Sequence, residues 1–187
     1  MRQTMTLPAL REELLKMREL DQAMQMDPKV NPTGPGHDER TRATYKKHNG
    51  RLRVILKQYG WPGEAMVGKD GSEAFWLLVQ HADADKDLQR KALTALERAV
   101  AYAQASRPNL AYLADRVLVN SKQKQRFGTQ LAWDSAAKPY PKPCEDEANL
   151  DARRIAMGLE TEAEYLKAAY EGILIIRARL NGTPDKK

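Results

Sequence analysis

The residues best suited to chemistry in this chain lie in the segment VQHAD at 79–83. The imidazole of His81 can give and take protons near neutral pH without much tuning. A nearby carboxylate would orient the ring and fix its tautomer, and Asp83 or, if a helix continues, Asp85 lies within reach. The segment therefore predicts a general acid/base at His81 with Asp83 as a catalytic partner. The alternative interpretation is a buried histidine that only ties a loop to a helix end.

Two later segments, AYLADRV at 111–117 and QRFGTQ at 125–130, supply further polar groups. Asp115 is another candidate catalytic carboxylate that could orient His81, and Arg116 could bind a carboxylate or phosphate bidentately. Glycine inside a strand often marks a place where a ligand or another backbone comes close. The expected substrate-binding residues are Trp61, Gln80, Arg116, Gln125, Gly128, Thr129 and Gln130. The structural alternatives are a buried Asp115–Arg116 ion pair and a Gly-Thr pair that only turns the strand.

Several familiar chemistries are excluded or disfavoured by the sequence. It contains no P-loop, no GxGxxG after a strand and no GxSxG elbow. The 3 histidines do not have the spacing of a helical metal site. Cys144 is the only cysteine, which excludes an intramolecular disulfide, and it lies in a proline-rich segment with no adjacent base. We therefore expect neither a metal nor a cofactor, and no thiol nucleophile.

The composition is that of a globular protein. Of the 187 residues, 42% are hydrophobic and 30% are charged. No apolar run approaches the roughly 20 residues that span a bilayer. Charges interrupt the apolar periodicity of the N-terminus, which is therefore not a signal peptide. We expect a soluble, cytoplasmic protein that does not bind a membrane.

The net charge of +6 is unevenly distributed. Residues 1–60 carry 12 Lys/Arg against 7 Asp/Glu, and residues 107–142 carry 7 against 2. These basic regions could form one face and attract an anionic partner, or they could be ordinary solvated side chains. A nucleic-acid-binding domain usually shows denser basic clusters with exposed aromatics. The expected partner is therefore a polar or anionic small molecule or peptide, with a protein partner as the alternative and nucleic acid disfavoured.

Helical periodicity dominates the chain. We expect helices at about 6–24, 38–59, 72–81, 85–104, 147–157 and 161–180, with Ser72 and Asp83 or Asp85 as N-caps. The β-branched RVLVN and the aromatic QRFGTQLAW predict a small β-hairpin near residues 115–133. The fold class is mainly α: a single-domain helical bundle of about six helices with this hairpin.

Prolines and glycines mark the boundaries between these elements. We expect an N-terminal helix in 1–26, a flexible Pro/Gly loop at 27–37, a core helical domain over 38–180 and a disordered tail at 181–187. The proline-rich 137–146 is expected to be an extended linker.

Five segments together resemble one protein family. They are GWP (60–62), VGKDGSEAFWLLVQHAD (67–83), AYLADRV (111–117), QRFGTQ (125–130) and DARRIAMGL (151–159). An uncharacterised bacterial domain family shares GWP, W-x-x-VQHAD, Y-L-x-DR and a terminal YGTQ. The resemblance covers residues 50–165 and implies that every catalytic and substrate-binding residue named above occupies a motif position. Phe127 stands where the family usually has Tyr, which argues against a phenol as an essential acid.

The resemblance implies no reaction, so three functions stay open. The first is a small enzyme, a hydrolase, transferase or lyase, with His81 as acid/base. The second is an interaction module, such as a regulator or a partner of a toxin or biosynthetic enzyme. The third is a nucleic-acid binder. The enzyme hypothesis requires His81, Arg116 and Gln130 to meet at one solvent-reachable site.

Overall fold

The computed structural model describes residues 6–26 and 39–181. The loop expected at 27–37 and residues 182–187 of the expected tail lie outside this part of the chain.

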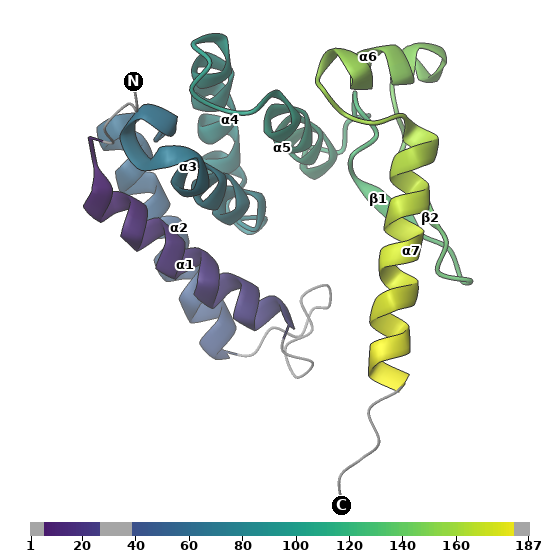
Figure 1. Ribbon diagram of the computed structural model, residues 1–187, viewed down its shortest axis with the longest axis horizontal. Coiled ribbons are helices and arrows are strands. Elements are labelled where there is room, and N and C mark those ends of the chain that lie inside the picture. Colours follow the sequence, from purple (N-terminus) through teal and green to yellow (C-terminus); the bar gives the residue numbers. More distant parts are fainter. Residues whose placement is uncertain (1–5, 27–38, 182–187) are drawn as a thin grey trace, which may run out of the picture. The chain divides into compact units, whose positions relative to one another are not determined.

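The structure confirms the mainly α class with one small hairpin (Figure 1). Its described residues form seven α-helices, one 3-10 helix and two strands: α1 (Pro8–Met26), α2 (Glu39–Tyr59), α3 (Glu64–Gln80), α4 (Lys86–Ala101), α5 (Arg107–Asn120), β1 (Leu131–Trp133), β2 (Pro139–Pro141), η1 (Glu147–Asn149), α6 (Leu150–Ala156) and α7 (Glu162–Asn181).

The prediction of a hairpin near 115–133 is wrong about its position. Residues 107–120 form α5, and the antiparallel hairpin pairs β1 with β2, so the expected linker at 137–146 contains the return strand. Ser106 accepts a hydrogen bond from the backbone N–H of Asn109, and Pro108 lies in the first turn of the helix. These start signals outweigh the preference of a short β-branched run for a strand.

Of the N-caps predicted for two other helices, one is confirmed and one is wrong. Asp85 caps α4 as expected, because its side chain accepts from the backbone N–H of Leu88 at 3.1 Å. Ser72 is not a cap, since α3 already begins at Glu64 and continues through a kink at Gly68. The buried Ser72 hydroxyl instead accepts a hydrogen bond from Trp61 Nε1 at 3.0 Å.

The chain divides into two compact units, Met1–Leu113 and Ala114–Lys187, and the division falls within α5. In the first unit α1 packs against α3, and α2 contacts both α3 and α4 (Figure 1). Backbone N–H groups of Thr6 and Leu7 donate to the carbonyls of Ala65 and Met66, which ties the start of α1 to the first turn of α3. The expectation of one core domain over 38–180 stays a prediction.

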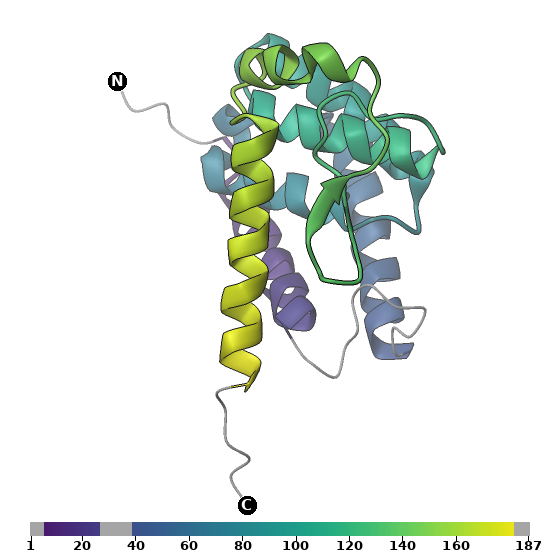
Figure 2. The same cartoon turned by 90° about the vertical axis from the view of Figure 1, so that its right-hand side faces the viewer.

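In the second unit the hairpin lies beside α7, and α6 precedes that helix (Figure 2). Before the hairpin, residues 125–130 form a loop held by the fully buried carboxylate of Asp115. This carboxylate accepts from the backbone N–H groups of Arg126 at 2.8 Å, Phe127 at 3.1 Å and Thr129 at 2.9 Å. The Thr129 hydroxyl donates a fourth bond at 2.9 Å. Asp115 therefore determines the shape of the 125–130 loop.

Two more buried side chains support the same loop. Gln125 donates to the carbonyls of Gln130 and Lys142, and its Oε1 accepts from the backbone N–H of Gln130. Arg154 is fully buried and donates through Nη1 to the carbonyl of Phe127 at 2.6 Å. Gly128 adopts a φ of +66°, which favours glycine over residues with a side chain. The polar residues of this segment thus build the loop itself.

We expect Asp115→Asn to lower the free energy of unfolding by about 2–4 kcal/mol, because an amide cannot accept all four hydrogen bonds and leaves buried donors unpaired. Urea denaturation monitored by circular dichroism measures the loss. The matched control is Glu147→Gln, which removes the same charge from an exposed side chain of the same unit and should change stability by less than about 0.5 kcal/mol. Equal stability of the two variants would contradict the assignment.

Candidate functional site

The buried side of α1 contains a charged residue. Asp21 follows Leu14 by seven residues, which places both on one face of the helix, and both are fully buried. A carboxylate removed from water is costly unless hydrogen bonds or opposite charges compensate it. The buried Asp21 carboxylate therefore requires a hydrogen-bond donor or a positive charge from a neighbouring element.

The facing part of α2 is polar as well. Thr41, His48 and Asn49 are buried on this helix, and only the later Leu52 and Ile55 continue the side as apolar core. Between them, Tyr45 Oη accepts a hydrogen bond from Gln25 Nε2 of α1 at 2.8 Å. The first half of α2 thus contributes polar groups rather than core to the first unit.

His81 completes the arrangement from the carboxyl end of α3. Its Nδ1 lies 2.7 Å from Asp21 Oδ2, and the imidazole side chain is 23% exposed while Asp21 is fully buried. Since an ionised carboxylate can only accept, Nδ1 is the ring nitrogen that donates, and in this tautomer Nε2 keeps its lone pair. The ring is therefore oriented from the protein side and reachable from solvent.

Gln89, a fully buried residue of α4, holds the end of α3 in place. Its Nε2 lies within 3.3 Å of three acceptors: the carbonyls of Val79 and Gln80 and the Asp83 carboxylate. These contacts satisfy groups at the end of the helix that lack partners within it. Gln89 therefore fixes the backbone from which His81 projects.

We call Asp21, Tyr45, His48, His81 and Asp83 the polar cluster. Two of its buried atoms, Asp21 Oδ1 and His48 Nδ1, have no hydrogen-bond partner among the residues that the structure describes. Unpaired buried polar atoms are rare in native proteins, because each one costs about 1–3 kcal/mol. These two atoms therefore leave hydrogen-bonding capacity in the polar cluster that the described residues do not use.

The surroundings change the ionisation of two cluster members. Burial, followed by the negative charges of Asp21 and Asp83, raises the pKa of Tyr45 above its ordinary value, so the phenol keeps its proton at neutral pH. Burial, with a smaller contribution from Lys47, lowers the pKa of His48, against the opposing charge of Asp21. At neutral pH the cluster therefore contains a protonated phenol and a neutral imidazole beside carboxylates.

The carboxylate that accepts the hydrogen bond from His81 belongs to Asp21. The sequence instead favours Asp83, Asp85 or Asp115 as the carboxylate that orients the ring. Asp83 accepts from Gln89, Asp85 caps α4 and pairs with Arg53, and Asp115 holds the 125–130 loop. The available signal was the period of α1, in which Asp21 interrupts the stripe of Leu10, Leu14, Met17 and Met24. The catalytic roles of His81, Asp83 and Asp115 stay predictions.

The expected substrate-binding residues fall into two groups. Trp61 and Gln80 belong to the first unit, where both are buried, and Gln80 Nε2 has no partner among the described residues. Arg116, Gln125, Gly128, Thr129 and Gln130 belong to the second unit. Gln125, Gly128 and Thr129 shape the 125–130 loop there, and Gln130 Nε2 donates to the Thr129 hydroxyl at 3.2 Å. Convergence of His81 with Arg116 and Gln130 stays a prediction.

The comparison with protein families matches residues 8–174 to a model described as "Family of unknown function (DUF6624)". The chain belongs to this family. The expected membership is thus confirmed, and the match extends the DUF6624 region to α1 and α2, which carry Asp21 and His48. No curated protein and no solved structure matches the chain.

Among the described residues, no three His, Cys, Asp or Glu side chains are grouped to hold a metal ion. The described helices include none with the length and apolar character needed to cross a bilayer.

Cys144 belongs to the second unit and is buried. Burial, reinforced by the negative charges of Asp115, Glu162 and Glu147, raises the pKa of its thiol to about 11. The thiolate is the nucleophilic form of cysteine, so almost none is present at neutral pH. This environment agrees with the exclusion of a thiol nucleophile.

We expect stability to depend on His48 in mildly acidic solution. Its folded pKa lies below the unfolded value of 6.5, so the unfolded chain binds more protons and stability falls as the pH drops through 6.5 toward the folded pKa. In His48→Gln, the free energy of unfolding should vary less with pH between about 5 and 6.5. Urea denaturation across this range measures both slopes, and identical slopes would show that the His48 pKa is not lowered.

We expect Cys144 to resist Ellman's reagent at about pH 8 in the native state and to react at once in urea. The control is the double variant Cys144→Ser with Ser121→Cys, which moves the thiol to an exposed position of the same unit. In the native state, the absorbance of the thiolate released from the reagent should rise rapidly for this control and not for the wild type. Equally fast labelling of the native wild-type chain would contradict the raised pKa.

Proposed function

We propose that this DUF6624 chain is an enzyme in which His81 is the general acid/base and Asp21 orients it. The observation that supports this proposal is the 2.7 Å contact between His81 Nδ1 and a fully buried carboxylate, with the His81 side chain itself 23% exposed. In known acid/base sites a buried carboxylate holds the imidazole in one tautomer and stabilises the imidazolium that forms.

The chemistry follows from the tautomer. With Nδ1–H donated to Asp21, the Nε2 lone pair takes a proton from a substrate or from water, and the imidazolium later returns it to a leaving group. Hydrolysis, group transfer and elimination all need this two-way proton transfer.

The other cluster members suit a polar substrate. Tyr45 offers a protonated phenol, and Asp21 Oδ1 and His48 Nδ1 are buried polar atoms without a partner among the described residues. Asp21 and Asp83 add negative charge, so the polar cluster favours neutral or cationic groups. An anionic group would require Arg116, Thr129 and Gln130, and their participation, like a cytoplasmic location, stays a prediction.

We expect His81→Gln to reduce turnover by about 10²–10⁴-fold, because the general acid/base is lost. Asp21→Asn should also slow turnover, since an amide no longer favours the productive tautomer. The assay incubates the purified chain with a small-molecule extract of cells and follows it by mass spectrometry. The wild type should consume at least one compound in molar excess over the protein. Glu97→Gln, an exposed change on α4, is the matched control and should behave as the wild type.

Turnover, rather than stability, separates catalysis from architecture. His81→Gln removes the imidazole that donates to the buried Asp21 carboxylate, so we expect it to lower stability by about 1–3 kcal/mol in either role. An interaction module is the second candidate, because Asp21 and His48 are buried between helices. In that case the wild type consumes no compound. That outcome, or equal turnover by wild type and both variants, would reject the enzyme proposal.

A further inference from the structure

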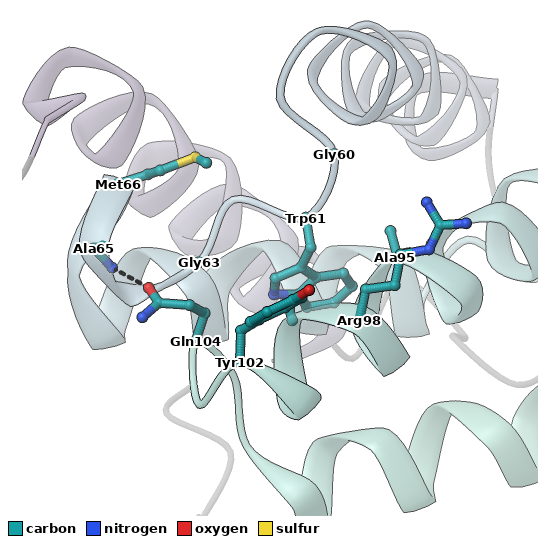
Figure 3. A pocket seen from close by; sticks show the side chains of 10 residues that line it. Gly60, Trp61, Gly63, Ala65, Met66, Ala95, Arg98, Tyr102 and Gln104 are labelled. Atoms are coloured by element: carbon teal, nitrogen blue, oxygen red, sulfur yellow. Dashed lines mark hydrogen bonds between the residues drawn. The ribbon is translucent and has the colours of Figure 1, made fainter.

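A separate pocket in the first unit lies where the α2–α3 turn and the start of α3 meet the end of α4 (Figure 3). Its cavity measures about 360 Å³, within the range of small-molecule sites. The residues that line it are Gly60, Trp61, Gly63, Ala65, Met66, Ala95, Arg98, Ala99, Tyr102 and Gln104. None of these belongs to the polar cluster.

The aromatic wall of the pocket is rigid. The Trp61 ring is held by its Nε1–H bond to the Ser72 hydroxyl and by an edge-to-face contact with Phe75, with ring centroids 5.0 Å apart. Gly60 directly before it adopts a φ of +67°, which ends α2 and turns the chain. A tryptophan held in one orientation binds a flat ligand without first losing side-chain freedom.

The wall opposite is fixed by Gln104. Its carbonyl accepts from the backbone N–H of Glu64 at 3.0 Å, and its Oε1 accepts from that of Ala65 at 2.9 Å (Figure 3). A Cβ placed on Gly63 would lie only 2.8 Å from Gln104 Cβ, so the two segments are in close contact. Because these first donors of α3 already have partners, an anion in the pocket must be recognised by another group.

Arg98 is the charged residue of the pocket lining. It is exposed, and the described residues provide no hydrogen bond or ion pair to its side chain, whereas Arg90 on the same helix lies 3.8 Å from Asp87. Among the described residues, the lining contains no carboxylate that could neutralise Arg98. Tyr102, beside it, is 80% exposed despite its aromatic ring. An apolar cavity beside a guanidinium to which the described residues supply no partner matches a ligand with an apolar body and one negative group.

We propose that this pocket binds a small free aromatic carboxylate, with its ring against Trp61, Ala95 and Ala99 and its carboxylate paired with Arg98. The aromatic ring and the alanine methyl groups supply apolar contact area, and the guanidinium supplies charge selectivity. The proposal is independent of His81 chemistry, because it uses other residues of the same unit.

The test titrates the full chain with 3-phenylpropionate up to about 10 mM and follows the Trp61 Nε1–H signal and the Met66 methyl by NMR. Both signals should shift saturably. The cationic analogue 3-phenylpropylamine, with the same ring, should bind about tenfold more weakly, because it cannot pair with Arg98. Absence of saturable shifts, or equal binding of acid and amine, would overturn the proposal.

Three variants locate the interaction. Arg98→Gln should reduce affinity for the acid about tenfold and leave that for the amine no weaker. Arg90→Gln, the matched control outside the pocket, should change neither. Ala95→Leu fills the cavity and should abolish binding of both probes, while its NMR spectrum reports that the chain is folded. Unchanged binding in Arg98→Gln or Ala95→Leu would place the ligand elsewhere.

A last titration, with a peptide in place of the acid, distinguishes a free aromatic acid from the carboxyl terminus of a protein chain as the ligand. A short peptide with a C-terminal phenylalanine carries the same ring and carboxylate. We expect it to bind no more tightly than 3-phenylpropionate. A peptide affinity about tenfold higher would overturn the free-acid proposal in favour of a chain terminus.

Discussion

The contact between His81 and Asp21 is the interaction on which the candidate chemistry of this chain depends. It joins the end of α3 to the buried side of α1 and leaves one carboxylate oxygen, Oδ1, without a partner among the described residues. Removing that carboxylate from water is unfavourable, and the imidazole is the group that offsets the cost by donating a short hydrogen bond. The same hydrogen bond determines the tautomer of the ring. It therefore both stabilises the buried carboxylate and orients the imidazole for the proposed chemistry.

A second buried aspartate, Asp115, has a different set of hydrogen bonds. Asp115 accepts four hydrogen bonds from the 125–130 loop, three of them from backbone N–H groups. Asp21 accepts from His81 and, at 3.2 Å, from Gln22. Both aspartates are fully buried, yet the first is saturated with partners and the second is not. The two carboxylates therefore differ in the number of their hydrogen bonds and not in their burial.

Both ends of α3 are held by glutamines of other segments, and each end adjoins a candidate site. Gln104 accepts from the first N–H groups of the helix beside the apolar pocket, and Gln89 donates to its last carbonyls beside the polar cluster. Helix ends have backbone groups without partners, and an amide side chain can both donate and accept. The two glutamines therefore make α3 the common support of the pocket and of His81.

The sequence alone determined the mainly α class and the end of α2 at Gly60, and it limited the cap of α4 to Asp83 or Asp85, because helix period and capping are local properties. It misplaced the hairpin, since the β-branched run of α5 resembles a strand when its packing is not considered. It singled out His81 but not its partner, which lies 60 residues earlier in the chain. Only the packing of α1 against α3 brings Asp21 to the imidazole, and no local pattern encodes which of several carboxylates will be there. The sequence thus singled out His81 as a candidate, and the tertiary structure decided which carboxylate meets it, because that contact depends on how α1 packs against α3.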